Sequence, residues 1–295
     1  MSTPPALLIA GHGTSDEAGA DEFRAFADRV GKRLASREVA VAGGFIELSP
    51  PPLADAVAGL FSDGHRRIAA VPLMLVAAGH AKGDIPAALA REQSRHPGLA
   101  VAYGRPLGPH PTVLSLLRER LSEVDEQLTE SVVLLVGRGS TDPDANSEVA
   151  KVARLLAETA EVAGVEFAFV SLAQPGVPAG LDRCAALGAK RIVVLPYFLF
   201  TGVLPDRVQA QAESWATGRS DVEVRCARVL GDTDELADLV IERYEEALNG
   251  DIRMNCDSCI YRIGLPGFES KVGAAQTPHH HPDDPGHHHH SHSHP

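Results

Sequence analysis

The sequence predicts an α/β protein with two similar halves, each a parallel sheet flanked by helices, followed by a disordered C-terminal tail. Short apolar runs alternate with stretches of helical periodicity through most of the chain. The pattern occurs twice, as an internal repeat at an offset of about 125 residues. The end of the chain is polar and rich in histidine, a composition that cannot build a core. The expected units are 1–126, 127–250 and a tail at 251–295.

Each half is expected to alternate strand and helix in the same order. The first strand is followed by a helix that carries apolar residues at helical spacing, and the other strands are each followed by a further helix. The strands of the first half are expected at 6–10, 39–46, 67–76 and 98–108. The first helix should bury Phe23, Phe26, Ala27, Val30 and Leu34, and later helices should cover 52–61, 84–93 and 112–124, the last closing the half. The second half begins with a strand at 132–136.

Composition excludes several classes of protein. The 295 residues carry a formal net charge of −12, which argues against binding to nucleic acid. No apolar run is long enough to cross a bilayer, and the N-terminus lacks the pattern of a signal peptide, so we expect a cytoplasmic protein without membrane contact. Four cysteines are too few for a disulfide scaffold. The oligomeric state, monomer or homodimer, stays open.

Three polar side chains lie at the ends of neighbouring predicted strands. His12 follows the first strand, Glu47 the second and His80 the third. The carboxyl ends of parallel strands meet at one edge of a sheet, where ligands bind. Two imidazoles and a carboxylate suit a divalent first-row metal that is held loosely, and such a site weakens as pH falls through the histidine pKa. Taken singly, each histidine is more often a packing residue and Glu47 a solvated or capping carboxylate.

The second half lacks this set of residues. The matching positions hold Arg138, Ser171 and Leu204, so the active centre is expected in the first half. The segment after His12 also permits an anion to bind at the backbone N–H groups of Gly13 and Thr14, where a helix begins. Capping of that helix by Ser15 or Asp16 is the equally weighted alternative.

At these residues the chain resembles the sirohydrochlorin chelatases. The resemblance rests on Gly-His-Gly at 11–13, on Glu47 and on the segment "PLMLVAAGHAKGDIP" at 72–86. It is similar to the long, duplicated form typified by the cobaltochelatases. The resemblance implies insertion of Co²⁺ or Fe²⁺ into sirohydrochlorin, on the way to cobalamin or sirohaem. It implies that His12 and His80 bind the metal and that Glu47 is the acidic residue of the site.

A substrate rich in carboxylates needs N–H donors and cations in its pocket. Candidates are Gly13 and Thr14, together with cations near predicted strand ends: Lys82, Arg105, Arg138 and Arg207. For each of these cations the alternative interpretation is a solvated surface charge. The alternative function is a non-catalytic metal-binding protein, a metallochaperone on a chelatase-like fold.

The tail carries two further metal-binding patterns. Cys256 and Cys259 form a Met-x-Cys-x-x-Cys motif that resembles an iron–sulfur motif of some long chelatases, with a bare dithiol as the alternative. Cys184 and Cys226 are expected to be core residues. A histidine tract follows, and we interpret it as a site of metal storage or delivery, with a cloning remnant as the alternative. Such a tract favours Co²⁺ over Fe²⁺ as the metal that is inserted. Its residues are His279, His280, His281, His287, His288, His289, His290, His292 and His294.

Overall fold

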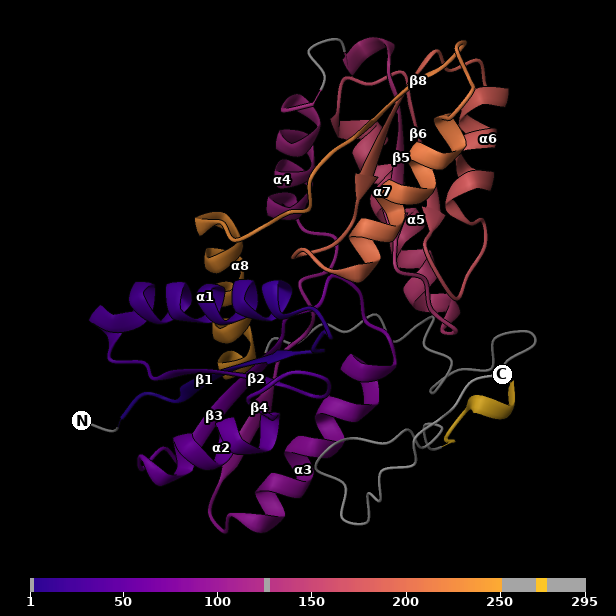
Figure 1. Ribbon diagram of the computed structural model, residues 1–295. Coiled ribbons are helices and arrows are strands. Elements are labelled where there is room, and N and C mark those ends of the chain that lie inside the picture. Colours follow the sequence, from indigo (N-terminus) through magenta and orange to yellow (C-terminus); the bar gives the residue numbers. More distant parts are fainter. Residues whose placement is uncertain (1–2, 125–127, 251–268, 275–295) are drawn as a thin grey trace.

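The computed structural model describes residues 3–124, 128–250 and 269–274 (Figure 1). Within them the chain forms two four-stranded parallel sheets with the orders β2-β1-β3-β4 and β6-β5-β7-β8. The first strand of each half is central and pairs with the next two strands on its two sides. Identical topology in the two halves fits the repeat seen in the sequence, and the α/β class predicted from the sequence is confirmed.

The first half alternates strand and helix. Its strands are β1 (Ala6–Gly11), β2 (Val41–Phe45), β3 (Arg67–Pro72) and β4 (Ala100–Tyr103). Its helices are α1 (Glu17–Leu34), α2 (Leu53–Ser62), α3 (Ile85–Arg95) and α4 (Pro111–Ser122), with a 3₁₀ turn at Ala35–Arg37 and a π-helical turn at His80–Asp84. All five apolar residues expected on the buried face of α1 are buried.

The second half repeats the order. Its strands are β5 (Val132–Gly137), β6 (Gly164–Phe169), β7 (Arg191–Pro196) and β8 (Glu223–Cys226). Its helices are α5 (Pro143–Thr159), α6 (Val177–Ala186), α7 (Val203–Ala216) and α8 (Asp234–Asn249), with a 3₁₀ turn at Leu128–Glu130. A further 3₁₀ turn at Glu269–Lys271 lies in the tail.

The strand β3 is shorter than the apolar run from which it was predicted. The N–H of Leu73 makes the last hydrogen bond to β1, at 2.8 Å from the Ala10 carbonyl. The strand then ends because Met74 turns back and donates its N–H to Pro72 at 2.9 Å. The chain that follows carries His80 into the π-helical turn, which apolar periodicity does not reveal. Turns of this kind occur often at functional sites.

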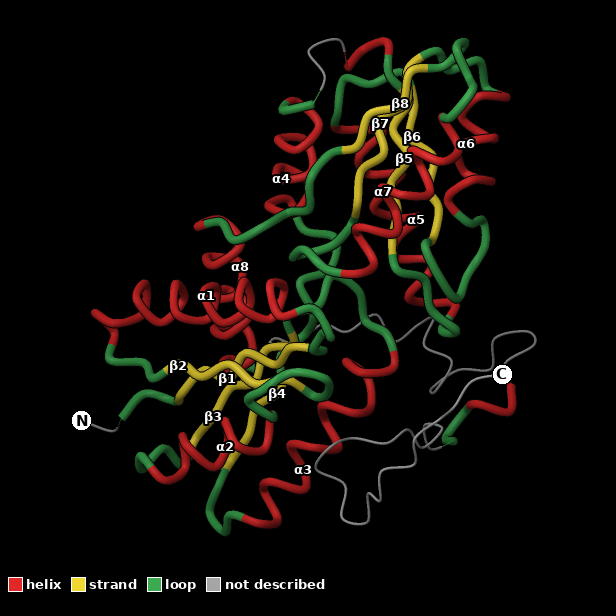
Figure 2. The backbone as a smooth tube through the Cα atoms, in the orientation of Figure 1, coloured by secondary structure: helices red, strands yellow, loops and turns green. Residues whose placement is uncertain are grey.

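The last helix of each half packs against the other half. Helix α8 lies beside α1 on the first sheet and contacts β3 and β4, whereas α4 contacts α5 and β7 of the second half (Figures 1 and 2). The helix expected to close the first half therefore exists, but it covers the second sheet. The ranges 1–126 and 127–250 describe the repeats along the chain, and the packed units exchange their final helices.

Two buried arginines at matching positions hold the exchanged helices. Arg120 of α4 donates to the carbonyl of Leu230 at 3.3 Å. Arg243 of α8 donates to the carbonyls of Pro106 at 3.3 Å and Leu107 at 3.0 Å. Both side chains are 1% exposed, so their hydrogen bonds to backbone oxygens are shielded from water.

Apolar cores lie on both faces of the sheets. One large cluster joins the halves, since it contains Leu7 and Ile9 of β1 together with Val133 and Leu135 of β5. The opposite faces are covered separately, by α2 and α3 in the first half and by α6 and α7 in the second. A shared core of this kind fixes the two sheets relative to each other.

Candidate metal and substrate site

The loops after β1 and β2 are packed backbone against backbone. Gly13 has φ +102°, and a Cβ at this position would lie 1.7 Å from the carbonyl oxygen of Glu47. Ile46 donates its N–H to Gly11 at 2.9 Å, and Glu47 donates to His12 at 3.1 Å. Only glycine permits this approach. The second glycine of the Gly-His-Gly motif thereby sets Glu47 beside His12.

The three strand-end residues come together at the carboxyl edge of the first sheet. Ligand atoms of His12, Glu47 and His80 all lie within 4.8 Å of one another. Nε2 of His12 is 3.3 Å from Oε1 of Glu47, and the two imidazole rings meet edge to face with centroids 4.3 Å apart. All three side chains are partly exposed, so an ion held here would remain open to other ligands.

His12 presents Nε2 to this cluster. Its Nδ1 lies 2.9 Å from the carbonyl oxygen of Gly13. A carbonyl only accepts, so Nδ1 carries the proton and the neutral ring keeps its lone pair on Nε2. Burial, with smaller contributions from the nearby His80 and Arg138, lowers the pKa of His12 to about 4. The ring is therefore neutral at neutral pH, as a metal ligand must be.

His80 is oriented by a carboxylate that sequence reasoning did not single out. Nδ1 of His80 lies 2.7 Å from Oδ2 of Asp84, one turn further along the chain, and the Asp84 side chain is 10% exposed. A carboxylate on one ring nitrogen fixes the tautomer and makes the other nitrogen a better metal ligand. The available signal was the spacing His-x-x-x-Asp, which brings two side chains together on one helical turn, although the predicted helix began only at Asp84.

The second half contributes Arg138 to the same place. Arg138 follows β5, and its Nη1 lies 3.0 Å from Nε2 of His12. The backbone around it copies the first half, because a Cβ on Gly139 would lie 1.9 Å from the carbonyl oxygen of Ser171. Leu204 lies half-buried on α7. The carboxyl ends of the two central strands therefore face each other across the site.

Two cations expected near substrate have carboxylate partners. Nζ of Lys82 lies 2.7 Å from Asp142 and 2.9 Å from Asp144, and its side chain is 7% exposed. Burial alone would lower the pKa of Lys82, but the two hydrogen bonds outweigh it and raise that pKa. Arg105 makes a two-point contact with Glu246 of α8, at 2.8 and 2.6 Å. Both pairs join the halves.

The other expected substrate contacts differ in whether they are available to a ligand. Arg207 is exposed on α7. Thr14 donates its N–H to Oγ of Ser49 at 2.9 Å, so this donor already has a partner. Asp16 caps α1 by accepting the N–H of Ala18 at 3.0 Å, which confirms the capping interpretation for that residue.

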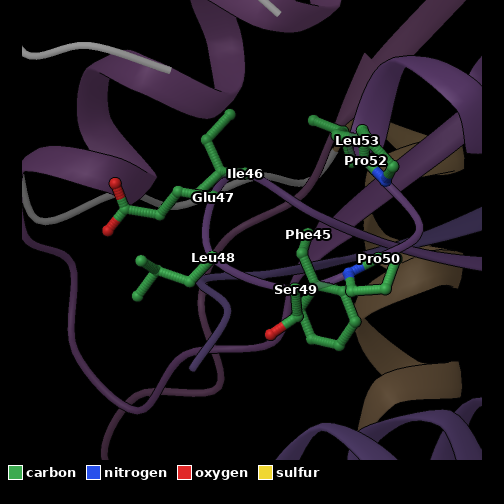
Figure 3. Close-up of a pocket in the computed structure, with 8 residues that line it drawn as sticks. All are labelled: Phe45, Ile46, Glu47, Leu48, Ser49, Pro50, Pro52 and Leu53. Atoms are coloured by element: carbon green, nitrogen blue, oxygen red, sulfur yellow. The ribbon is translucent and has the colours of Figure 1, made fainter. Parts of the chain in front are cut away.

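A cavity of about 240 Å³ opens beside Glu47. Figure 3 shows Glu47 and Leu48 extending from one side of their loop, while Pro50 and Pro52 lie on the other. Leu48 is 62% exposed, and Leu172 at the matching position of the second half is also 62% exposed. Each half thus carries one exposed apolar side chain in the loop that follows its second strand.

The tail motifs lie outside the described residues, namely Cys256, Cys259 and the nine histidines from His279 to His294. Cys184 is buried in the core, as expected, whereas Cys226 is only partly buried and packs against the same core. Among the described residues no helix is long and apolar enough to cross a membrane.

A family model called CbiX matches the chain twice, over residues 6–124 and 132–247. The chain belongs to the CbiX family. Sirohydrochlorin cobaltochelatase of Priestia megaterium is 36% identical over 264 residues, which is 88% of this chain and 85% of the relative. Sirohydrochlorin ferrochelatase of the same organism is 33% identical over 247 residues, covering 83% of this chain and 91% of the relative. The resemblance stated from the sequence is thereby confirmed.

Solved structures of the family have the same fold. SirB from Bacillus subtilis with Fe³⁺ superposes with a TM-score of 0.73 at 28% identity, covering 84% of this chain and 97% of the other. SirB from Bacillus subtilis subspecies spizizenii in complex with cobalt gives a TM-score of 0.67 at 27% identity, with the same coverage of 84% and 97%. Both relatives were solved with a first-row metal.

Proposed function

We propose that this protein inserts a divalent first-row metal into sirohydrochlorin. The observation that carries the proposal is the convergence of His12, Glu47 and His80 at one sheet edge. The relatives support it, since one cobaltochelatase and two ferrochelatases of sirohydrochlorin match 88%, 83% and 70% of the chain. The metal is substrate here, delivered to the site and passed on to the ring.

The reaction exchanges two protons for one metal ion. Two pyrrole N–H bonds break, two metal–nitrogen bonds replace them, and the remaining ring nitrogens complete the equatorial set. His12 and His80 present the ion to one face of the ring, and Glu47 accepts protons as the pyrrole nitrogens lose them. Glu47 is suited to this role because its carboxylate lies 3.3 Å from His12 and is partly exposed, so that it passes protons to water.

Weak retention of the metal is part of the function. A closed site with four protein ligands holds its ion as structural zinc sites do, whereas three donors leave positions for water and for ring nitrogens. The partial exposure of the three side chains fits such an open site.

Substrate contacts are proposed on both sides of the metal ligands. Arg138 and the exposed Arg207 are the cations of the predicted set that we assign to ring carboxylates, whereas Lys82 and Arg105 serve the contact between the halves. Leu48 and Leu172 offer apolar surface to a flat macrocycle. Gly13 acts through the shape of its loop.

Cobalt is the proposed metal, because histidine-rich segments bind Co²⁺ more strongly than Fe²⁺ in the usual affinity order. Relatives named for each metal match the chain, at 36% identity for the cobaltochelatase and 33% for the ferrochelatase. The comparisons do not support an iron–sulfur cluster at Cys256 and Cys259.

Insertion assays on variants test the function. Absorbance of the ring is followed anaerobically with Co²⁺, Fe²⁺ or Ni²⁺, using His12→Ala, His80→Ala and, as a control away from the site, His65→Ala. We expect insertion to be lost in the first two variants alone. Near-normal turnover in either, with unchanged circular dichroism, would remove the assignment. A metallochaperone would bind metal and yield no metallated ring.

A conservative variant distinguishes a proton-accepting role of Glu47 from a role as metal ligand. Glu47→Gln should slow insertion more than it weakens metal binding if the carboxylate takes protons. Equal losses of rate and of metal affinity would make Glu47 a metal ligand without a proton role.

A further inference from the structure

The Nε2 atom of His12 is within reach of two groups that compete for it, the guanidinium of Arg138 and a metal ion. Nδ1 is held by the Gly13 carbonyl, so the neutral ring has a single lone pair, on Nε2. Nη1 of Arg138 lies 3.0 Å from this atom and donates to it. The same Nε2 points to Glu47 at 3.3 Å and is the atom available to a metal ion.

We propose that Arg138 competes with the metal for Nε2 of His12 and thereby keeps the ion weakly held, ready for transfer to the ring. The inference rests on the proposed function, because it takes His12 as a metal ligand. It assigns to the second half a direct part in metal release, whereas the sequence predicted that half to be catalytically blank.

The competition follows from the chemistry of the two groups. One lone pair cannot accept an N–H and bind a metal ion at the same time. Arginine keeps its positive charge at all relevant pH values, so Arg138 does not yield by losing a proton. A guanidinium within hydrogen-bond distance of a ligand atom also repels the divalent ion that would bind there. Both effects lower the affinity of the site for metal.

Other contacts keep Arg138 close to His12. The carboxylate of Glu47 attracts the guanidinium. The loop that carries Arg138 is fixed by the approach of Gly139 to Ser171, and the halves are joined nearby through Lys82 and Asp142. When an ion moves from His12 to the ring, Arg138 is in place to take the vacated lone pair, which makes return of the ion less favourable. This exchange favours forward transfer.

Metal titration of the full-length chain tests the competition. Co²⁺ binding is followed by visible absorbance in wild type, Arg138→Met and Arg138→Gln, and the isotherm of His12→Ala is subtracted from each to remove binding elsewhere, including the tail. We expect both Arg138 variants to bind the His12-dependent Co²⁺ about tenfold more tightly, equivalent to about 1.4 kcal/mol. Arg183→Met, which replaces an exposed arginine of α6 in the same half, should leave this affinity unchanged.

Insertion kinetics provide the second measurement. With Co²⁺ saturating, kcat of Arg138→Met should fall because the ion is released more slowly. A residue that only bound substrate carboxylates would raise KM and leave Co²⁺ affinity unchanged.

The outcomes separate the two proposals. Equal Co²⁺ affinity in wild type and both Arg138 variants, with all three above His12→Ala, overturns the competition and leaves the chelatase function standing. Weaker binding in the Arg138 variants also overturns it. A wild-type isotherm that matches His12→Ala overturns both proposals, because His12 would then bind no metal.

Discussion

Replacing Lys82 by methionine should destabilise the protein rather than weaken substrate binding. The ammonium lies 2.7 Å from Asp142 and 2.9 Å from Asp144, and the exposed fractions of the three side chains are 7%, 5% and 2%. Removing one partner of a buried pair leaves uncompensated charge and costs about 3–5 kcal/mol. Two carboxylates are stranded here, so we expect the upper part of this range, a large share of the roughly 5–15 kcal/mol that stabilises a typical domain.

Urea unfolding followed by circular dichroism measures the effect. The midpoint for Lys82→Met should fall well below that of wild type, with the slope as a check on whether both halves still unfold together. Adding Asp142→Asn and Asp144→Asn to Lys82→Met should recover much of the loss, because the stranded charges are gone. Asparagine at 142 keeps the cap of α5, in which the side chain accepts the N–H of Asp144 at 3.0 Å.

The opposite pattern would refute this reasoning. An unchanged urea midpoint together with a large rise in KM for sirohydrochlorin would show that Lys82 contacts substrate. Failure of the two asparagine substitutions to restore stability would show that the cost comes from packing of the lysine chain and not from unpaired charge.

Three further results are expected. Asp84→Asn should weaken Co²⁺ binding at the site about 10–100-fold, because the carboxylate orients His80, and titration against the His12→Ala baseline checks it; unchanged affinity would deny Asp84 that role. The hydrogen bond from Arg105, helped by Arg243, holds the pKa of Glu246 below its ordinary value of 4.5, so its contribution to stability is present above pH 4.5 and is lost as pH falls further. Glu246→Gln should therefore lose less stability than wild type between pH 5 and pH 3 by urea midpoint, and parallel losses would contradict this. Removing the chain after Gly264 should leave insertion unchanged with excess metal, slow it under buffered metal and abolish several bound Ni²⁺ equivalents; equal rates at limiting metal would make the tail a bystander.

The site was more predictable from the sequence than the packing around it. His12, Glu47 and His80 each follow a predicted strand, and parallel strands bring such positions to one edge. Asp84 was missed because apolar periodicity does not reveal a π-helical turn. A position near a strand end does not reveal which carboxylate a cation contacts. Lys82 and Arg105 were therefore predicted to bind substrate, although both contact carboxylates of the other half.

The exchange of α4 and α8 was not predictable from one sequence. An amphipathic helix shows which of its faces is apolar, but either sheet satisfies that face equally well. What decides between them are contacts far apart in the chain, such as Arg120 with Leu230 and Arg243 with Pro106. A pattern read in local windows does not contain them.

The exchanged helices also constrain how the chain matures during synthesis. Tyr244 of α8 donates its hydroxyl hydrogen to the carbonyl of Pro5 at 2.6 Å, a contact between residues 239 positions apart. The first sheet leaves the ribosome with α1, α2 and α3, but part of one face waits for almost the whole chain to be made. Contacts of such sequence separation are costly to close and slow to form. A ribosome-bound chain halted before α8 should consequently expose apolar surface on β3 and β4, and should be protected from proteases only once residue 249 has emerged.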